Sequence, residues 1–406
     1  MPAKRIYLYM LLIFAVLVFF NITQMLFRDV GFNTATHLAD AFLNGRMHVF
    51  PPGEPLDVIE HEGRYYVPFP PAPAIMLMPL VALFGLEFSP LWITPLMGAL
   101  TAGMLVLLYF RFTGDEELSF TLSVAMILGT AFWLCVRYAF DTYLAHMLTV
   151  LVVTIALWES LGKQRGWLIG ICLGIACSSR QLSVFVIPFV FTLLWCLPRN
   201  KSSWLARLFP VISASAVLGV FLFGLLWYNW ARFGSPLDSG YSRVIEETWY
   251  TYRLEKWGNF SWRYIPSNFL RFFVAGFTIE FHPPGYLQPY MSPWGTSLTY
   301  ASPFIFYGFV KVREGLPRLA AVVGRVCTAL IVLALLMHKS AGGGWIINGI
   351  RYALDFLPLW SLFVALGMQH YGTGAGLKLR RYVVAYSVLL NVLAIVITHT
   401  RHFFPA

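Results

Sequence analysis

The sequence predicts an all-α polytopic membrane protein, on the basis of its composition and the length of its apolar runs. Of its 406 residues, 58% are hydrophobic and only 12% are charged, and the mean hydropathy is +0.67. A soluble domain averages about 25% charged residues, so this chain lacks the polar surface that solubility in water requires. Its apolar runs approach the length of about 20 residues that a helix needs to cross a bilayer. The same composition excludes intrinsic disorder. The five cysteines all fall inside apolar runs, which excludes a secreted disulfide scaffold.

Eleven apolar runs are candidate membrane helices, and we expect them to form one integral membrane domain over residues 1–406. The first run is longer than the apolar region of a signal peptide and has no small-residue cleavage site, so it is expected to remain as the first span. Two long loops, 28–90 and 231–299, interrupt the series. The candidate spans cover 6–27, 91–110, 119–137, 143–160, 167–180, 182–197, 208–230, 300–312, 320–337, 352–370 and 382–397.

Positive charge orients these spans, because Lys and Arg collect in cytoplasmic loops. Lys4 and Arg5 place the N-terminus in the cytoplasm. A twelfth apolar run, 71–86, has 16 residues and measures about 24 Å as a helix, less than the roughly 30 Å hydrocarbon core. We therefore expect 71–86 to lie in the outer interface, which puts the C-terminus outside and all the short basic loops inside. These basic loops are 163–165, 199–207, 311–325 and 378–381.

The basic balance of the chain, a net charge of +10, is explained by these cytoplasmic loops. No basic run or repeated basic motif is present, so we expect no nucleic-acid partner. The outer face, in contrast, receives the long loops and most of the unusual polar residues. Ionisable residues near a membrane are costly and are functional candidates by default. The outer-face candidates are Asp29, Asp40, Arg137, Asp141, His146, Arg180, Arg351 and Asp355.

Two carboxylates belong to the first outer loop. Asp29 directly follows the first span, and Asp40 lies in the segment 31–46, whose apolar residues recur at helical spacing. That segment is expected to form an amphipathic helix on the membrane surface. The alternative roles are a helix-start carboxylate for Asp29 and a solvated polar face for Asp40.

Two further candidate sites on the outer side combine charged residues with helix ends. Asp141 and His146 follow Arg137 around one turn and are candidates to line a single cavity; the alternative is an interfacial ion pair with Arg137. Arg180 lies between two apolar runs, where an arginine can bind phosphate through paired hydrogen bonds or extend to the interface.

The glycine-rich segment 342–355 contains a second candidate arginine. Glycines allow close approach of the backbone to a ligand, and Arg351 is expected to open a span with Asp355 four residues later on the same helical face. The alternative is a local ion pair. No phosphate-loop, nucleophile-elbow or zinc motif occurs, so no cofactor is indicated. A divalent metal remains open, because Asp29, Asp40, Asp141 and His146 are candidates to converge.

Several blocks, in order along most of the chain, resemble the type C glycosyltransferases of bacterial inner membranes, which use polyprenyl-phosphate-linked sugars. The first outer loop has the order surface helix, Gly-Arg-x-Tyr, paired prolines and second interfacial helix. Later blocks add a small-residue helix ending in an arginine and a run from the last apolar turn into Tyr241. The blocks are 37–46, 63–66, 68–73, 83–85, 170–180, 228–241, 292–295, 302–303, 349–352 and 357–358.

The resemblance implies a fold with interfacial helices in the first periplasmic loop. It also implies inverting transfer of a sugar from a polyprenyl-phosphate donor to a hydroxyl of a lipid, glycan or protein acceptor, at the periplasmic face. A carboxylate at the end of the first span acts as base in this family; Asp29 matches, although the adjacent acidic pair is reduced to one residue, which leaves Asp40 as a rival. Arg180 and Arg351 match donor-phosphate positions.

For such a reaction, we expect four residues to take supporting roles or to line the acceptor pocket: Asp141, His146, Tyr241 and Asp355. Membrane lipids, the donor and the acceptor are the expected partners.

Other classes share the composition. A lipid or polyprenyl-linked-sugar flippase or transporter would show inverted repeats or matching broken spans in two halves, and no internal repeat is visible. A membrane acyltransferase would require a His-centred motif, for which His146 alone is thin support.

Overall fold

The computed structural model describes most of the chain. Contacts within it group the chain into two compact units, each built from separate stretches. Unit 1 comprises Met1–Val16, Gly98–Leu134 and Phe260–Ala406, and unit 2 comprises Leu17–Met97 and Cys135–Asn259. The described residues are 3–27, 33–50, 58–197, 204–243, 255–276, 279–281, 289–291, 296–311, 315–339 and 350–400.

Five described helices are long and apolar enough to cross a membrane, which confirms the all-α membrane class. A sixth span is formed if α5 (Glu116–Leu128) and α6 (Phe132–Tyr138), which meet at 49°, are counted as one bent span. The predicted count of eleven is not confirmed, because several predicted runs form shorter helices. The five spans are Ala3–Ile22, Pro90–Thr113, Asp141–Ser160, Arg207–Phe233 and Arg318–Met337.

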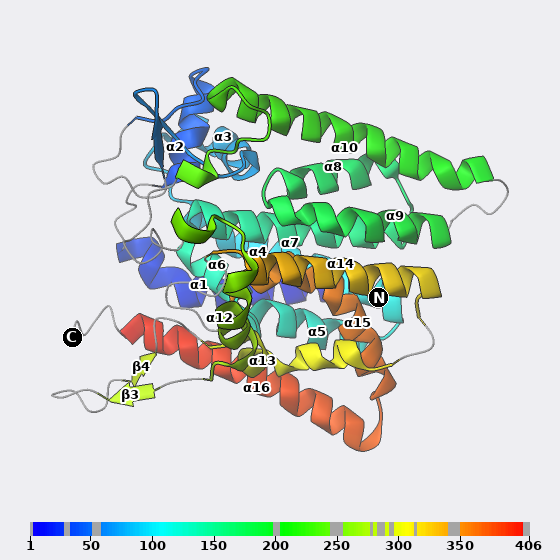
Figure 1. Ribbon diagram of the computed structural model, residues 1–406. Coiled ribbons are helices and arrows are strands. Elements are labelled where there is room, and N and C mark those ends of the chain that lie inside the picture. The colour runs from blue at the N-terminus through cyan, green and yellow to red at the C-terminus, as the bar shows by residue number, and fades with distance from the viewer. Residues whose placement is uncertain are drawn as a thin grey trace. The chain divides into compact units, whose positions relative to one another are not determined.

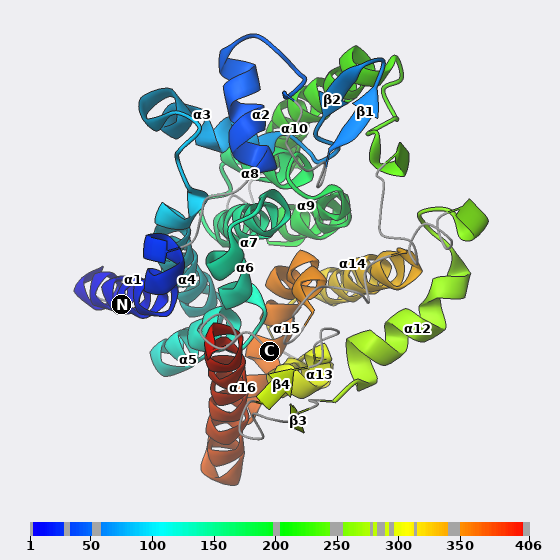
Figure 2. The ribbon, with the colours of Figure 1, turned by 90° about the vertical axis from the view of Figure 1, so that its left-hand side faces the viewer.

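Unit 2 contains four helices that lie side by side in both views (Figures 1 and 2). Helix α8 packs on α10 through a glycine stripe: a Cβ at Gly170 would stand 2.6 Å from the Ala214 carbonyl oxygen, and one at Gly174 would overlap the Phe221 ring. Small residues at this spacing let two membrane helices approach closely. The four helices are α7 (Asp141–Ser160), α8 (Gly166–Cys177), α9 (Ile187–Cys196) and α10 (Trp204–Phe233).

One end of unit 2 carries two short helices and a hairpin. Helix α2 (Thr34–Leu43) packs on α3 (Ala72–Phe84), and in the sequence between these two helices β1 (Ile59–His61) pairs with β2 (Arg64–Tyr66). With 13 residues, α3 is about 20 Å long and too short to cross a bilayer, as the sequence predicted for the run 71–86.

Unit 1 contains the first part of α1 (Ala3–Phe27), most of α4 (Thr94–Thr113), α5 and a series of later elements. The 3₁₀ helix η6 (Pro303–Phe309) packs against α15 and α16. Short helices α12 (Ile265–Phe269) and α13 (Leu298–Ala301) and the strand pair β3 (Ile279–Phe281) and β4 (Pro289–Met291) precede it. The long later helices are α14 (Arg318–Met337), α15 (Leu357–His370) and α16 (Gly374–Thr400).

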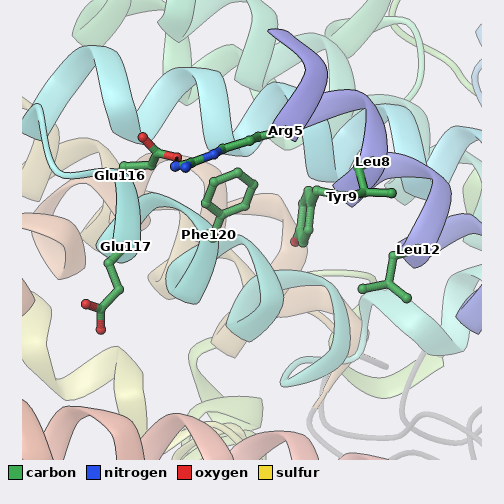
Figure 3. A pocket seen from close by; sticks show the side chains of 7 residues that line it. All are labelled: Arg5, Leu8, Tyr9, Leu12, Glu116, Glu117 and Phe120. Carbon is green, nitrogen blue, oxygen red and sulfur yellow. Dashed lines mark hydrogen bonds and ion pairs between the residues drawn. The ribbon is translucent and has the colours of Figure 1, made fainter. Parts of the chain in front are cut away.

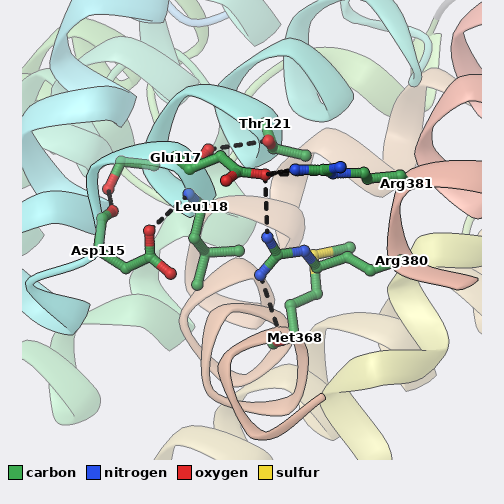
Figure 4. A network of polar contacts seen from close by, with 8 residues as sticks. Asp115, Glu117, Leu118, Thr121, Met368, Arg380 and Arg381 are labelled. Carbon is green, nitrogen blue, oxygen red and sulfur yellow. Dashed lines mark hydrogen bonds and ion pairs between the residues drawn. The ribbon is translucent and has the colours of Figure 1, made fainter. Parts of the chain in front are cut away.

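Charged side chains join the beginnings of three helices at one end of unit 1. Arg5 of α1 contacts Glu116 of α5 at 2.7 Å, beside a groove that Tyr9 and Phe120 also line (Figure 3). The neighbouring Glu117 accepts hydrogen bonds from Arg381 of α16, the shorter at 2.7 Å (Figure 4). These contacts agree with the alternation of spans, which put the N-terminus and the loops before α5 and α16 on one side.

Polar contacts also join α16 to α6 and α13, and the end of α13 to the end of α5. Trp133 donates its indole N–H to Asn391 Oδ1 at 2.8 Å, and Asn391 donates to the Ala301 carbonyl at 3.2 Å. Ser302 donates to the Gly129 carbonyl at 2.6 Å, where α5 ends. A buried amide or hydroxyl without such a partner would be costly, so these bonds fix how the helices of unit 1 meet.

Candidate functional site

The turn before α7 is fastened to the start of α2 within unit 2. Asn33 caps α2 by accepting the Ala35 N–H at 3.0 Å and donates its amide to the Ala139 carbonyl at 3.3 Å. Thr34 donates its hydroxyl to Asp141 Oδ2 at 3.1 Å. Asp141 is buried in the first turn of α7, where the helix dipole stabilises a carboxylate. The turn predicted around Asp141 therefore meets the predicted surface helix.

A second contact brings α3 to the end of α8. The Ala72 N–H donates to the Ser178 carbonyl at 2.9 Å, two residues before Arg180. Arg180 is half-buried, and its N–H donates to the Ala176 carbonyl at 2.8 Å before the 3₁₀ helix η2 (Gln181–Val186) begins. The predicted span 167–180 is thus shorter as a helix, since α8 ends at Cys177 and the Ser178 carbonyl pairs with α3.

Arg232, near the end of α10, is a structural cation that the sequence reasoning did not single out. It is 5% exposed and donates to the Val67 carbonyl at 2.7 Å and to Asn229 Oδ1 at 2.9 Å. Its guanidinium lies 3.7 Å from the centre of the Tyr228 ring. The only sequence signal was its place in the block 228–241. Arg232 holds the segment that leads from the β1–β2 hairpin into α3.

An aromatic cluster continues from this point toward Tyr241. Phe233 packs with Ile59 and Tyr66 of the hairpin. Tyr241, predicted for the acceptor pocket, is half-buried and its ring centre lies 6.4 Å from that of Phe69. Tyr241 therefore lies against the segment that joins the hairpin to α3.

Asp40 is engaged at the end of α2. Its Oδ2 accepts a hydrogen bond from Arg46 at 3.0 Å, and its Oδ1 accepts one from Asn44 at 3.1 Å. His37, one turn earlier, is half-buried; burial lowers its pKa, and the charge of Asp40 opposes that shift. Asp40 is therefore a bound carboxylate next to a histidine that resists protonation. Asp29, the other candidate base, lies outside the described residues.

His146 is buried in α7, five residues after Asp141. At about 100° per residue, five residues turn a helix by about 140° from the starting position. The two side chains therefore leave α7 on different sides. Arg137, the third member of this group, donates to the Phe20 carbonyl at 3.1 Å.

Arg351 and Asp355 belong to unit 1. The predicted α-helical spacing between them is corrected: they begin and end a 3₁₀ helix, η7 (Arg351–Asp355), and α15 starts only at Leu357. In a 3₁₀ helix, positions four apart are about 120° from each other and do not share a face. Asp355 is buried, and the Arg351 guanidinium lies 5.1 Å from the centre of the Tyr352 ring. The glycines at 342–344 lie outside the described residues.

Across the described part of the chain, no group of three or more His, Cys, Asp and Glu residues is placed to hold a metal ion. Of the four predicted ligands, Asp40, Asp141 and His146 are described and form no such cluster. Asp29 lies outside the described residues.

The arrangement of the helices defines the fold class. The chain has the GT-C fold, the fold of the type C membrane glycosyltransferases, and it is a multi-pass membrane protein. No family model and no curated protein matches its sequence. The evidence for the fold comes from two solved structures that it resembles.

One of these is ArnT from Cupriavidus metallidurans bound to undecaprenyl phosphate, with a TM-score of 0.52 and 13% identity over 98% of this chain and 72% of that one. The other is the Archaeoglobus fulgidus oligosaccharyltransferase in its apo form, with a TM-score of 0.52 and 12% identity over 96% of this chain. The chain corresponds to 56% of that larger protein. At this identity the likeness establishes the fold.

Proposed function

We propose that the protein is a glycosyltransferase that moves a sugar from a polyprenyl-phosphate-linked donor to a hydroxyl of a lipid, glycan or protein acceptor. We place the reaction at the periplasmic face of a bacterial inner membrane. The observation that carries the proposal is a GT-C fold in which α2, α3, the turn before α7 and the residues before η2 meet at one end of unit 2. The undecaprenyl phosphate bound to ArnT supports the choice of a polyprenyl-phosphate donor.

Arg180 of unit 2 and Arg351 of unit 1 are the two candidate cations for the donor phosphate. When the sugar leaves, negative charge grows on the phosphate, and guanidinium groups stabilise that charge through paired hydrogen bonds. Arg180 follows the carbonyl that anchors α3, and Arg351 is positioned by the 3₁₀ helix η7. Both arginines are half-buried, which strengthens their electrostatic effect.

The base is assigned to Asp29 in preference to Asp40. A general base must have a carboxylate oxygen free to accept the proton of the acceptor hydroxyl. Both oxygens of Asp40 are already engaged, since Oδ2 accepts a hydrogen bond from Arg46 and Oδ1 accepts one from Asn44. In this assignment Asp40 stabilises the end of α2 and takes no part in the reaction.

The reaction balances as a single displacement. The acceptor oxygen forms a bond to the anomeric carbon, its proton moves to the base, and the bond from that carbon to the phosphate oxygen breaks. Polyprenyl phosphate leaves, and the sugar carbon is inverted. Asp141 and Tyr241 are proposed to line the acceptor pocket, where the Tyr241 ring offers a face for sugar stacking.

A transfer assay tests the proposal. Purified protein in lipid receives a panel of polyprenyl-phosphate-linked sugars and a glycolipid extract, and products are followed by mass spectrometry. We expect an acceptor heavier by one sugar, formed by wild type and by a Lys378→Ala control at the exposed start of α16, and lost in Arg180→Ala, Arg351→Ala and Asp29→Asn. Asp40→Asn should retain activity.

Two outcomes of this assay would contradict the proposal. If no donor yields a product and labelled lipid instead moves between leaflets without covalent change, the protein is a flippase or transporter. If Asp40→Asn abolishes transfer while Asp29→Asn does not, the assignment of the base is reversed.

A further inference from the structure

Unit 1 contains an apolar pocket of about 360 Å³ that the proposed reaction does not use. It lies between α14, η6 and the start of α15, and α14 is one of the candidate spans. A volume in this range fits a small ligand or part of a larger one. Aromatic side chains dominate its wall: Phe273, Phe306, Phe309, Phe356 and Trp360.

The polar atoms of the wall are already used within the protein. Thr299 donates to the Phe273 carbonyl at 2.6 Å, and Thr328 donates to the Gly324 carbonyl at 2.9 Å. The indole N–H of Trp360 donates to the Ile305 carbonyl at 3.0 Å. The pocket therefore offers a ligand carbon surface and few hydrogen bonds, which suits an alkyl chain.

Arg325 is the cation of this pocket. It is exposed on α14, and its guanidinium lies 4.9 Å from the centre of the Phe363 ring. Within the residues that the structure describes, no ion pair or hydrogen bond engages it. Arg318 lies seven residues earlier, two helical turns along the same face, so the face of α14 that borders the pocket begins with a second exposed cation.

We propose that this pocket binds one acyl chain of an anionic membrane phospholipid, whose phosphate is held by Arg325. The wall and the cation together match a molecule with an apolar tail and a negatively charged head. A guanidinium binds phosphate oxygens in pairs, and a head at the surface of a membrane helix leaves the tail free to enter between aromatic rings.

The position of Arg325 separates this lipid from the donor. Arg325 precedes Met337, the last residue of α14, by twelve residues, or about 18 Å along the helix. The ring of His338, the next residue, lies 6.4 Å from that of Tyr352, the neighbour of Arg351. A phosphate on Arg325 is therefore far from the end of α14 that adjoins Arg351. The tail can extend toward Phe356, which directly follows η7.

Native mass spectrometry of the purified full chain tests the site without any assay of activity. The probes are dioleoyl phosphatidylglycerol, dioleoyl phosphatidylcholine and a polyprenyl phosphate, each added alone and in competition. We expect wild type to retain phosphatidylglycerol over phosphatidylcholine. Arg325→Gln should lose about tenfold in affinity, as expected when a charge-assisted pair is removed, and Arg325→Lys should recover part of it.

Two more variants control the result. Ala329→Phe fills the pocket and should lower retention with Arg325 intact, while Lys378→Gln removes an exposed cation elsewhere in unit 1 and should change nothing. Melting temperatures show whether each variant is folded. The proposal is overturned if wild type does not prefer phosphatidylglycerol, or if folded Arg325→Gln and Ala329→Phe retain it as wild type does. It is also overturned if polyprenyl phosphate displaces phosphatidylglycerol at equal concentration.

Discussion

Removing the Arg232 side chain should weaken unit 2 more than removing any exposed arginine. In Arg232→Ala, the Val67 carbonyl loses a donor at 2.7 Å in a residue with no solvent exposure, and Asn229 loses a partner at 2.9 Å. A hydrogen bond from a charged donor contributes about 1.5–3 kcal/mol, and a cation over an aromatic ring adds roughly 0.5–2 kcal/mol. These terms overlap, so we expect the free energy of unfolding to fall by about 3 kcal/mol.

The assay is thermal unfolding in one detergent at one scan rate, because membrane proteins often unfold irreversibly. A loss of about 3 kcal/mol corresponds to a fall in the melting temperature of roughly 6 °C for a unit of this size. Arg243→Ala is the matched control: Arg243 pairs with Asp238 at 2.6 Å, but 35% of its side chain is exposed, so its loss should cost under about 1 kcal/mol. Arg232→Lys should fall between the two. Equal melting temperatures for Arg232→Ala and Arg243→Ala would refute the reasoning.

Three further predictions concern unit 2. Gly170→Ala should lower stability by about 2 kcal/mol, since its Cβ would stand 2.6 Å from the Ala214 carbonyl oxygen, whereas Gly219→Ala on α10, with nothing within 4 Å, should be neutral; similar melting temperatures would disprove the close contact of α8 and α10. Burial lowers the pKa of His37 in the folded protein, so the unfolded chain binds the proton more tightly. The free energy of unfolding is therefore highest above about pH 6.5, where His37 is neutral in both states, and it declines as the pH falls below that value. His37→Gln should make the melting temperature less sensitive to pH between 7.5 and 5.5, and an unchanged slope would count against this. Glu159, whose side chain is fully buried, accepts two hydrogen bonds from the Arg165 guanidinium at 3.0 Å, so Glu159→Gln should cost about 2 kcal/mol by chemical denaturation, and a cost near zero would contradict the pair.

Sequence reasoning succeeded where composition and length decide the outcome. The apolar runs predicted the membrane class, and the 16-residue length of 71–86 predicted that this helix would be too short to cross. The basic loops and the alternating direction of the spans also predicted that the N-terminus and the loops before α5 and α16 would lie on the same side. The contacts of Arg5 with Glu116 and of Arg381 with Glu117 agree with this. These features depend on composition, on the length of apolar runs and on the positions of charged residues, all of which can be read from the sequence.

It failed where a distant segment decides a local structure. Nothing near residue 178 shows that its carbonyl pairs with Ala72, which ends α8 early. The 3₁₀ geometry of η7 is likewise not visible in its side chains, so the expectation that Arg351 and Asp355 lie on one face of an α-helix was wrong. Arg232 was overlooked because its main partner, Val67, is 165 residues away.

The shortness of α8 has a consequence for the surrounding lipid. Its 12 residues measure about 18 Å, well below the roughly 30 Å of a hydrocarbon core, yet Arg165 precedes it and Arg180 closely follows it. For α8 to cross the membrane, either the bilayer must thin beside unit 2, or one of these cations must lie at the depth of the acyl chains. In both cases the stability of the protein depends on the hydrophobic thickness of the host membrane. Short-chain lipids should suit it and long-chain lipids should strain it, independently of head-group charge.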